Sequence, residues 1–230
     1  MVQDQGFRRE QIEVWATPVD LERFRPPSDA ERTESRAALG LESTTPVAVA
    51  VGRLDRLKGI DVLLDAWRVI SERYGSAALL VVGAGPDRSA LEGSARTRDL
   101  QNVRFLGQRE DVLALLWAAD VMAMPSRQEA MPMAALEALA CGVPVVGSRV
   151  GGIPDIIRDG ENGVLVPVED PGALAQAIET LFSDEQRRQA LARGAARLIE
   201  PYGLDRFVAT LEARYRELAA HAPETLPPRR

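Results

Sequence analysis

The chain has 230 residues, 46% of them hydrophobic and 27% charged, which is ordinary for a globular protein with a sizeable core and excludes a disordered or collagen-like chain. A single cysteine, Cys141, excludes an internal disulfide framework and a metal site of clustered cysteines. The formal charge of −6 argues against a general nucleic-acid binder, so we expect no nucleic-acid partner.

Short apolar runs alternate with longer amphipathic stretches from about residue 46 to residue 182, a rhythm typical of repeated βαβ units. The apolar runs predict strands over residues 47–51, 79–82, 103–105, 121–124, 144–146 and 163–166. Between them the spacing predicts helices from Ile60, after Asp87, around 112–116 and over 132–141. The strands show little internal alternation, so we expect an α/β fold with a Rossmann-like parallel sheet between helices.

The remaining segments flank this core. Residues 1–45 are predicted to be a lead-in with a charged, helix-like stretch over 28–39, and residues 46–200 the Rossmann-like domain. Helices are expected over 171–182, 184–199 and 204–221, the last being a C-terminal extension over 201–221, and 222–230 are expected to form a disordered tail. The chain has no long uninterrupted apolar run and no secretory pattern at its start, so we expect a cytoplasmic protein.

The loop after the first strand carries the first candidate site. It runs from Gly52 to Gly59 and places Arg53 and Lys58, the only lysine of the chain, five residues apart before a helix. In open α/β sheets ligands bind at the carboxyl ends of the strands. Two cations with glycines at both ends suit a diphosphate, although a solvated loop is the plain alternative.

The loop after the second strand begins like a dinucleotide fingerprint. It reads Gly83-Ala84-Gly85-Pro86-Asp87-Arg88, with Arg88 where the third glycine belongs. A tight turn followed by a helix that starts at Pro86 explains the same residues, so we discount binding of NAD here.

Two carboxylates follow the fourth strand. Glu137 is the only charged residue between Ala130 and Ser148, and a carboxylate in apolar company needs polar partners such as sugar hydroxyls. Glu129 precedes a helix that Pro132 is expected to open, where it is placed to face the crevice. An ordinary N-terminal helix charge is the alternative for Glu129.

The first turn of this helix is a candidate anion site. Helix N-termini present N–H groups without intrahelical partners, which favour anions. We expect free N–H groups at Met131, Met133 and Ala134, beside Pro132.

Several motifs in a fixed order resemble one known family. They are Gly52-Arg53-Leu54 with Lys58-Gly59, Gly83-Ala84-Gly85-Pro86, Phe105-Leu106-Gly107, Ala119-Asp120-Val121, Pro125-Ser126, Glu129 with Glu137, and Gly142-Val143-Pro144. Together they resemble the retaining glycosyltransferases of family 4, over about residues 10–220. The resemblance implies the C-terminal, nucleotide-sugar-binding half of a GT-B architecture.

The same resemblance implies roles for single residues. Arg53 and Lys58 would bind the donor diphosphate, Glu129 the hydroxyls of the transferred sugar, and Glu137 the ribose hydroxyls. We therefore expect Arg53, Lys58 and Glu129 to be catalytic, with no metal and no further cofactor. The donor-binding set is expected to comprise Gly52, Arg53, Lys58, Arg104, Leu106, Arg109, Glu129, Met131, Pro132, Met133 and Glu137.

The implied reaction transfers a hexose-like group from a UDP- or GDP-sugar to an acceptor that the sequence leaves open as a glycan, a lipid or a small molecule. The implied mechanism is front-face substitution, in which the leaving diphosphate accepts the proton of the acceptor. The family's N-terminal domain is expected as a separate partner, and it would also provide any peripheral attachment to the inner membrane face.

Two other functional classes stay open at this point. The domain could bind a nucleotide sugar without catalysis, as a sensor or docking module. An NAD-dependent oxidoreductase rests only on the Rossmann-like pattern and the incomplete loop at Gly83.

Overall fold

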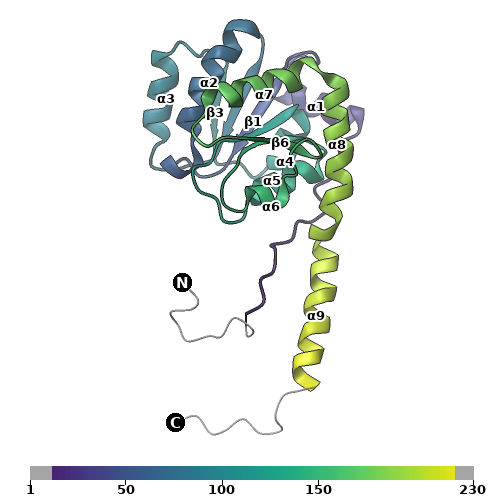
Figure 1. The fold of residues 1–230 in the computed structure, drawn as a ribbon. Coiled ribbons are helices and arrows are strands. Elements are labelled where there is room, and N and C mark those ends of the chain that lie inside the picture. Colours follow the sequence, from purple (N-terminus) through teal and green to yellow (C-terminus); the bar gives the residue numbers. More distant parts are fainter. Residues whose placement is uncertain (1–11, 221–230) are drawn as a thin grey trace.

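Six short segments form one parallel sheet in the computed structural model, which describes residues 12–220 (Figure 1). The strands are β1 (Val47–Val51), β2 (Ala78–Val82), β3 (Val103–Gly107), β4 (Val121–Met124), β5 (Val145–Ser148) and β6 (Gly163–Val166). Their order across the sheet is β3-β2-β1-β4-β5-β6, and every neighbouring pair is parallel. The predicted strands and the parallel α/β class are confirmed.

Helices connect the strands and extend the chain beyond them. They are α1 (Asp29–Ala38), α2 (Ile60–Arg73), α3 (Arg88–Thr97), α4 (Val112–Ala118), α5 (Met133–Ala140), α6 (Ile153–Ile156), α7 (Pro171–Ser183), α8 (Glu185–Ile199) and α9 (Leu204–Ala220). The short α6 and the 3-10 turns η3 (Arg56–Lys58) and η4 (Glu200–Tyr202) were not predicted, because such short elements show no periodicity. The prediction that a helix starts at Pro86 was wrong: Pro86 lies in a turn and α3 begins at Arg88.

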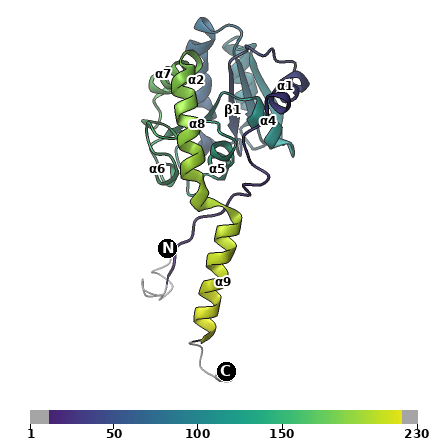
Figure 2. The same ribbon diagram turned by 90° about the vertical axis from the view of Figure 1, so that its right-hand side faces the viewer.

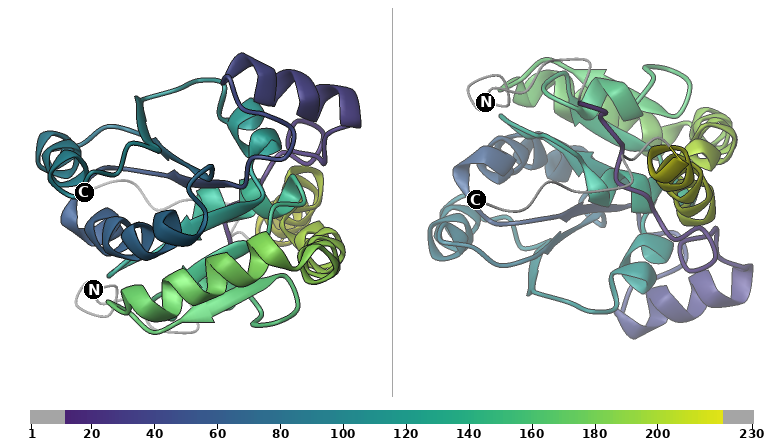
Figure 3. Two further views of the ribbon diagram at one scale, coloured as in Figure 1. Left: turned by 90° about the horizontal axis from the view of Figure 1, so that it is seen from above. Right: turned by 90° about the horizontal axis from the view of Figure 1, so that it is seen from below.

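Alternate residues of the strands point to two separate hydrophobic layers, which explains the nearly continuous apolar runs. In β1, Val47 and Val49 pack with residues of α4 and α5, whereas Ala48 and Ala50 pack with residues of α2 and α7. Trp67 of α2 is fully buried in the second layer. The sheet is therefore covered by helices on both faces (Figure 3).

Helix α1 packs against α4 at the outside of the first layer. A capping box starts it: the Ser28 side chain accepts the N–H of Glu31, and the Glu31 carboxylate accepts the N–H of Ser28. The Arg36 side chain is buried, and its guanidinium donates to the carbonyls of Ala118, Glu42 and Thr45. These bonds tie the stretch over 28–39 to the sheet domain.

Helix α9 extends away from the sheet domain (Figures 1 and 2). Its base is joined to the lead-in by a bridge between Val19 and Gly203, and the rings of Trp15 and Phe207 meet edge to face at 5.6 Å between centroids. His221 and the predicted tail at 222–230 lie outside the described residues. Within residues 12–220, no helix is both long and apolar enough to cross a membrane.

Candidate functional site

The loops after β1 and β4 meet at the point where the strand order reverses. β1 and β4 are neighbours in the sheet, but β2 and β3 follow on one side of them and β5 and β6 on the other. Ligands of open α/β sheets bind in the crevice at such a switch point, beyond the carboxyl ends of the strands. The two loops that flank it are residues 52–59 and 125–132, which carry the candidate cations and Glu129.

The structure brings Lys58 and Glu129 together across this point. The Nζ of Lys58 lies 2.5 Å from the Oε2 of Glu129, and the side chains are 29% and 9% exposed. Lys58 ends the turn η3, which Asp55 starts by accepting the N–H of Leu57 with its side chain. The pair thus joins a cation and a carboxylate that are 71 residues apart in the sequence.

Close backbone packing holds the two loops at this distance. Gly59 follows Lys58 with a left-handed φ of +65°, and a Cβ there would stand 2.0 Å from the carbonyl oxygen of Pro125. On the far side of Glu129, a Cβ on Gly151 would stand 1.8 Å from the Glu129 carbonyl oxygen, which accepts the N–H of Gly152. Glycine is needed at both positions because only a residue without a Cβ permits these approaches.

Arg53 and Gly52 border two cavities at the ends of the strands. A small one lies at the ends of β1 and β4 and is lined by Arg53, Lys58, Ser126 and Glu129 among others. The second, of about 290 Å³, lies beyond the ends of β1, β2 and β3 and is lined by Val51, Gly52, Arg53, Val82, Gly83, Ala84, Gln108, Arg109 and Val112. The Arg53 side chain is 68% exposed and its Nε lies 3.0 Å from Asp55 Oδ2. The structure thus brings Arg109 to the same cavity as Arg53, as the predicted donor-binding set requires.

The structure does not bring Arg104 to this cavity. Arg104 is the second residue of β3, and its guanidinium donates to the carbonyl oxygen of Leu39 after α1, at 2.5 Å. Leu106 is partly buried against the hydrophobic layer below α4 and does not line the cavity either. Both residues lie inside β3, where side chains point to the faces of the sheet, and their membership of the donor-binding set stays a prediction. Gln108, which sequence reasoning did not select, lines the cavity instead.

The start of α5 differs in one respect from the prediction. Pro132 is its N-cap and Met133 its first residue, but the N–H of Met133 donates to the carbonyl of Met131 at 3.0 Å and is not free. Among the backbone hydrogen bonds of loops, turns and caps in the described residues, none is donated by the N–H of Met131 or of Ala134. The first turn of α5 therefore offers fewer free donors than the sequence suggested.

Glu137 lies partly buried on α5. Burial raises the pKa of its carboxyl group, and the charge of Arg23 counteracts part of this effect. No hydrogen bond to its carboxylate is found within residues 12–220, in contrast to Glu129. Among the described residues, no three histidine, cysteine, aspartate or glutamate side chains cluster as metal ligands.

The glycine-containing loop after β2 packs against the loop after β1. The N–H of Leu54 donates to the carbonyl of Ala84 at 2.9 Å, and the N–H of Asp87 donates to the carbonyl of Leu54 at 3.0 Å. The glycines of this loop therefore allow its backbone to pack closely against residues 52–54, and this packing holds the backbone around Arg53 in place.

Arg127 is the main residue of this region that sequence reasoning missed. It lies two residues before Glu129, and its guanidinium pairs with Asp61 of α2 and with Glu169 before α7. Hydrogen bonds from Arg127 to the two carboxylates raise the pKa of its guanidinium group. Nothing in the local pattern reveals this role, because both partners are distant in the sequence.

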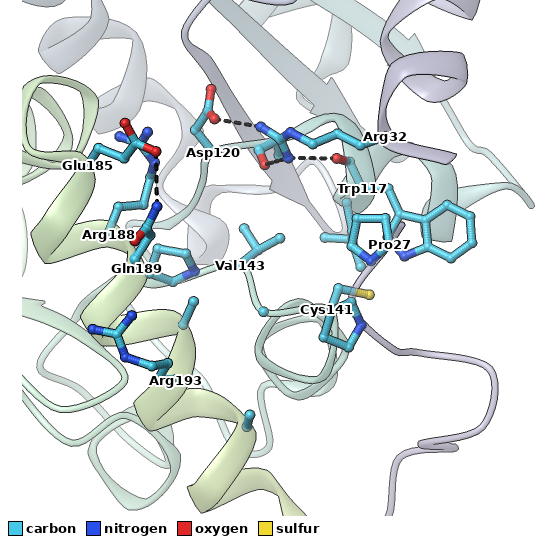
Figure 4. A pocket seen from close by; sticks show the side chains of 17 residues that line it. Pro27, Arg32, Trp117, Asp120, Cys141, Val143, Glu185, Arg188, Gln189 and Arg193 are labelled. Atoms are coloured by element: carbon cyan, nitrogen blue, oxygen red, sulfur yellow. Dashed lines mark hydrogen bonds and ion pairs between the residues drawn. The ribbon is translucent and has the colours of Figure 1, made fainter. Parts of the chain in front are cut away.

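A separate pocket lies at the opposite end of the strands, where β4 and β5 begin (Figure 4). It is bordered by Asp120, Cys141 and Val143 and by one face of α8 with Arg188 and Arg193. Cys141 is 3% exposed, and burial followed by the charge of Glu137 raises the pKa of its thiol to about 12. Cys141 thus belongs to the hydrophobic core of the sheet domain.

Known proteins share both the sequence pattern and the fold. The family model "Glycosyl transferases group 1" matches residues 31–198. D-inositol 3-phosphate glycosyltransferase of Corynebacterium urealyticum is 37% identical over 227 residues, covering 94% of this chain and 54% of the relative. The chain spans about half the length of such curated relatives: the Salinispora tropica protein of the same name is 39% identical, and 46% of it is covered.

Solved structures agree with this match. Sucrose-phosphate synthase of Thermosynechococcus elongatus superposes with a TM-score of 0.84 at 30% identity, over 96% of this chain and 57% of that one. Anabaena HepE, solved in complex with UDP-glucose, has a TM-score of 0.83 at 25% identity, over 96% and 60%. The fold thus matches that of GT-B glycosyltransferases, and the family model covers most of the sheet domain. By these matches, the chain belongs to the group 1 glycosyl transferases.

Proposed function

We propose that the chain is the donor-binding half of a retaining glycosyltransferase that takes a hexose-like group from a UDP- or GDP-sugar. The observation that carries this proposal is the pairing of Lys58 with Glu129 at the switch point, next to the cavity shared by Arg53 and Arg109. A cation for the diphosphate and a carboxylate for the sugar hydroxyls then stand side by side, at the place where this fold binds ligands.

Donor binding would exchange the partners of this ion pair. The ammonium group of Lys58 would turn from Glu129 to the diphosphate, and Arg53, whose side chain is mostly exposed, would join it from the other side of the loop. The Glu129 carboxylate would then accept hydrogen bonds from two sugar hydroxyls. Because each group leaves one charged or polar partner for another, neither is left buried and unpaired.

The same cations would stabilise the charge that develops on the leaving diphosphate. In the proposed front-face substitution, the bond from the anomeric carbon to the diphosphate oxygen breaks and the acceptor oxygen bonds to the same face of that carbon. The departing diphosphate takes the acceptor proton, so the chain itself supplies charge stabilisation and orientation. Glu137 would accept hydrogen bonds from the ribose hydroxyls, and Arg109 would border the base.

Calorimetric titration of UDP and GDP into the chain tests the donor site. We expect saturable binding of one of them, and a loss of about tenfold or more in affinity for Lys58→Ala. Arg68→Ala, which removes an exposed cation on α2, is the matched control and should bind like the wild type. Absence of binding for both nucleotides, or unchanged binding by Lys58→Ala, would refute the donor site.

The acceptor and the second half of the cleft belong to the whole enzyme. Relatives named D-inositol 3-phosphate glycosyltransferase make an inositol phosphate the first acceptor to test, and they are about twice as long as this chain. An N-terminal GT-B domain is proposed to supply the acceptor site. Helix α9 and residues 12–18, which project together from the sheet domain, are the proposed connection to it (Figure 2).

A binding module without catalysis is the second candidate, because the candidate residues all serve the donor and none of them is assigned to an acceptor. Incubation of the chain with a radiolabelled UDP-sugar and an acceptor separates the two functions. Release or transfer of sugar by the chain alone would exclude the binding-only function. Saturable nucleotide binding without turnover would support it, unless an added N-terminal domain restores transfer.

A further inference from the structure

We propose that Arg127 is a positioning residue that holds Lys58 and Glu129 at their working distance. Its guanidinium binds both carboxylate oxygens of Asp61, at 2.8 Å from Nη1 and 2.7 Å from Nη2. Nη1 also donates to the carbonyl of Arg56 at 2.8 Å, and Nε donates to Glu169 Oε1 at 2.7 Å. Such bidentate, charge-assisted bonds fix geometry as well as adding energy.

These bonds join three segments near the carboxyl ends of the strands. Arg56 belongs to the turn η3 that ends at Lys58, Asp61 to the first turn of α2, and Glu169 to the segment between β6 and α7. The backbone strengthens the link, because the N–H of Arg127 donates to the carbonyl of Leu57 at 2.8 Å. Leu57 directly precedes Lys58 and Arg127 stands two residues before Glu129, so both members of the ion pair are anchored through Arg127.

Two further observations indicate that the contacts of Arg127 fix the positions of the residues that it binds. The Arg127 side chain is 17% exposed, and hydrogen bonding to it, followed by its charge, lowers the pKa of Asp61. Glu169 has a positive φ of 58°, a conformation that residues other than glycine rarely adopt and that persists only where surrounding contacts determine it. The fork of arginine matches these partners, and lysine, a point charge, could not bridge both carboxylates.

Arg98 provides a matched control. It pairs with Asp65, one turn after Asp61 on α2, with distances of 3.1 Å from Nε and 2.7 Å from Nη2 to Asp65 Oδ1. This pair joins α2 to the end of α3 and touches neither loop of the switch point. Arg127→Gln and Arg98→Gln therefore each remove one arginine–aspartate link from the same helix, but only the first releases Lys58 and Glu129.

The experiment measures how fast an amine-directed reagent modifies Lys58, read as the mass of the peptide that contains it. Lys58 is the only lysine, so the N-terminal amine is the only other primary amine of the chain. We expect Arg127→Gln to speed this modification several-fold and Arg98→Gln to leave it unchanged, with both variants still folded by their melting curves. Arg127→Lys should fall between the wild type and Arg127→Gln. Equal rates for wild type and folded Arg127 variants would overturn the proposal.

A second measurement covers the case in which Arg127→Gln does not fold. Glu169→Gln keeps the guanidinium in place and removes one charged partner, so it should give a smaller increase of the modification rate. Equal rates for wild type, Glu169→Gln and Arg127→Lys would then overturn the proposal.

Nucleotide affinity adds a functional readout, which rests on the proposed donor site. If wild type binds UDP or GDP, Arg127→Gln should bind it about tenfold more weakly while Arg98→Gln binds normally. If wild type binds neither nucleotide, the proposed function fails, whereas the modification rates still test Arg127. Normal nucleotide binding by folded Arg127→Gln would overturn the positioning role and leave the donor site standing.

Discussion

Gly59 approaches Pro125 so closely that a Cβ at position 59 would stand 2.0 Å from the Pro125 carbonyl oxygen. Gly59 directly follows Lys58, and Pro125 begins the loop that carries Glu129. The distance between the Lys58 and Glu129 side chains therefore depends on glycine at position 59, which lets the two loops approach each other.

Gly59→Ala should therefore separate the two loops and lower the free energy of unfolding by about 2 kcal/mol or more, since it adds a clash to an unfavourable φ. Gly40→Ala is the control, because Gly40 has a similar φ of +61° with nothing within 4 Å of its Cβ position. It should cost only about 1 kcal/mol. Chemical denaturation measures both, and equal losses would show that the contact with Pro125 carries no energy.

Glu129→Gln should weaken binding of the sugar part of the donor without weakening binding of the nucleotide. The amide no longer holds the ammonium of Lys58 by charge, so UDP itself should bind at least as well as to the wild type. The additional affinity of UDP-glucose over UDP should fall about tenfold, because an amide replaces an acceptor of two hydroxyl groups. Titration of both ligands checks this, with Glu92→Gln of α3 as the surface control. Equal losses for UDP and UDP-glucose would contradict a role at the sugar.

Glu137→Gln should stabilise the fold while weakening nucleotide binding. Burial raises the folded-state pKa of Glu137 above 4.5, so ionisation disfavours the folded state. Wild type therefore loses stability as the pH rises from the unfolded pKa through the folded one, and the penalty is constant above both. Glu137→Gln has no carboxyl group to ionise at this position, so it does not lose stability in this way.

Thermal melts of wild type and Glu137→Gln across this pH range provide the measurement. The advantage of the variant should grow as the pH rises from the ordinary pKa of a glutamate through the raised folded-state pKa, and shrink on acidification. An advantage that is independent of pH, or a variant less stable at neutral pH, would contradict the assignment of burial as the dominant cause.

Arg36→Leu should destabilise the whole sheet domain. Arg36 Nη1 lies 3.7 Å from Asp120 Oδ2, with side chains 4% and 13% exposed, so the substitution leaves a largely buried carboxylate with one partner fewer. We expect a loss of about 3 kcal/mol or more in a single transition. Arg68→Leu, which breaks the exposed pair with Glu72, should change the free energy by about 0.5 kcal/mol or less. Separate melting of the segment before β1 would instead show that α1 is not part of the domain.

Much of the fold was predictable because its signals are local. Most strands are short apolar runs between breakers, and burial on both faces of the central strands β1, β2, β4 and β5 is what makes their runs continuous. Lys58 and Glu129 could likewise be selected from the sequence, since each follows a predicted strand and ligands bind beyond the strand ends. The position of the Arg104 side chain at a face of the sheet also follows from local reasoning, because side chains inside a strand point to the faces of the sheet.

The sequence by itself determined which segments become strands and helices and which polar side chains stand at their ends. Only the tertiary structure decided which of those ends are neighbours. The placement of β4 beside β1 puts Glu129 against Lys58 and lets Arg127 reach Asp61 and Glu169. Strand order is set by the packing of the whole sheet and its helices, and no local pattern of residues encodes it.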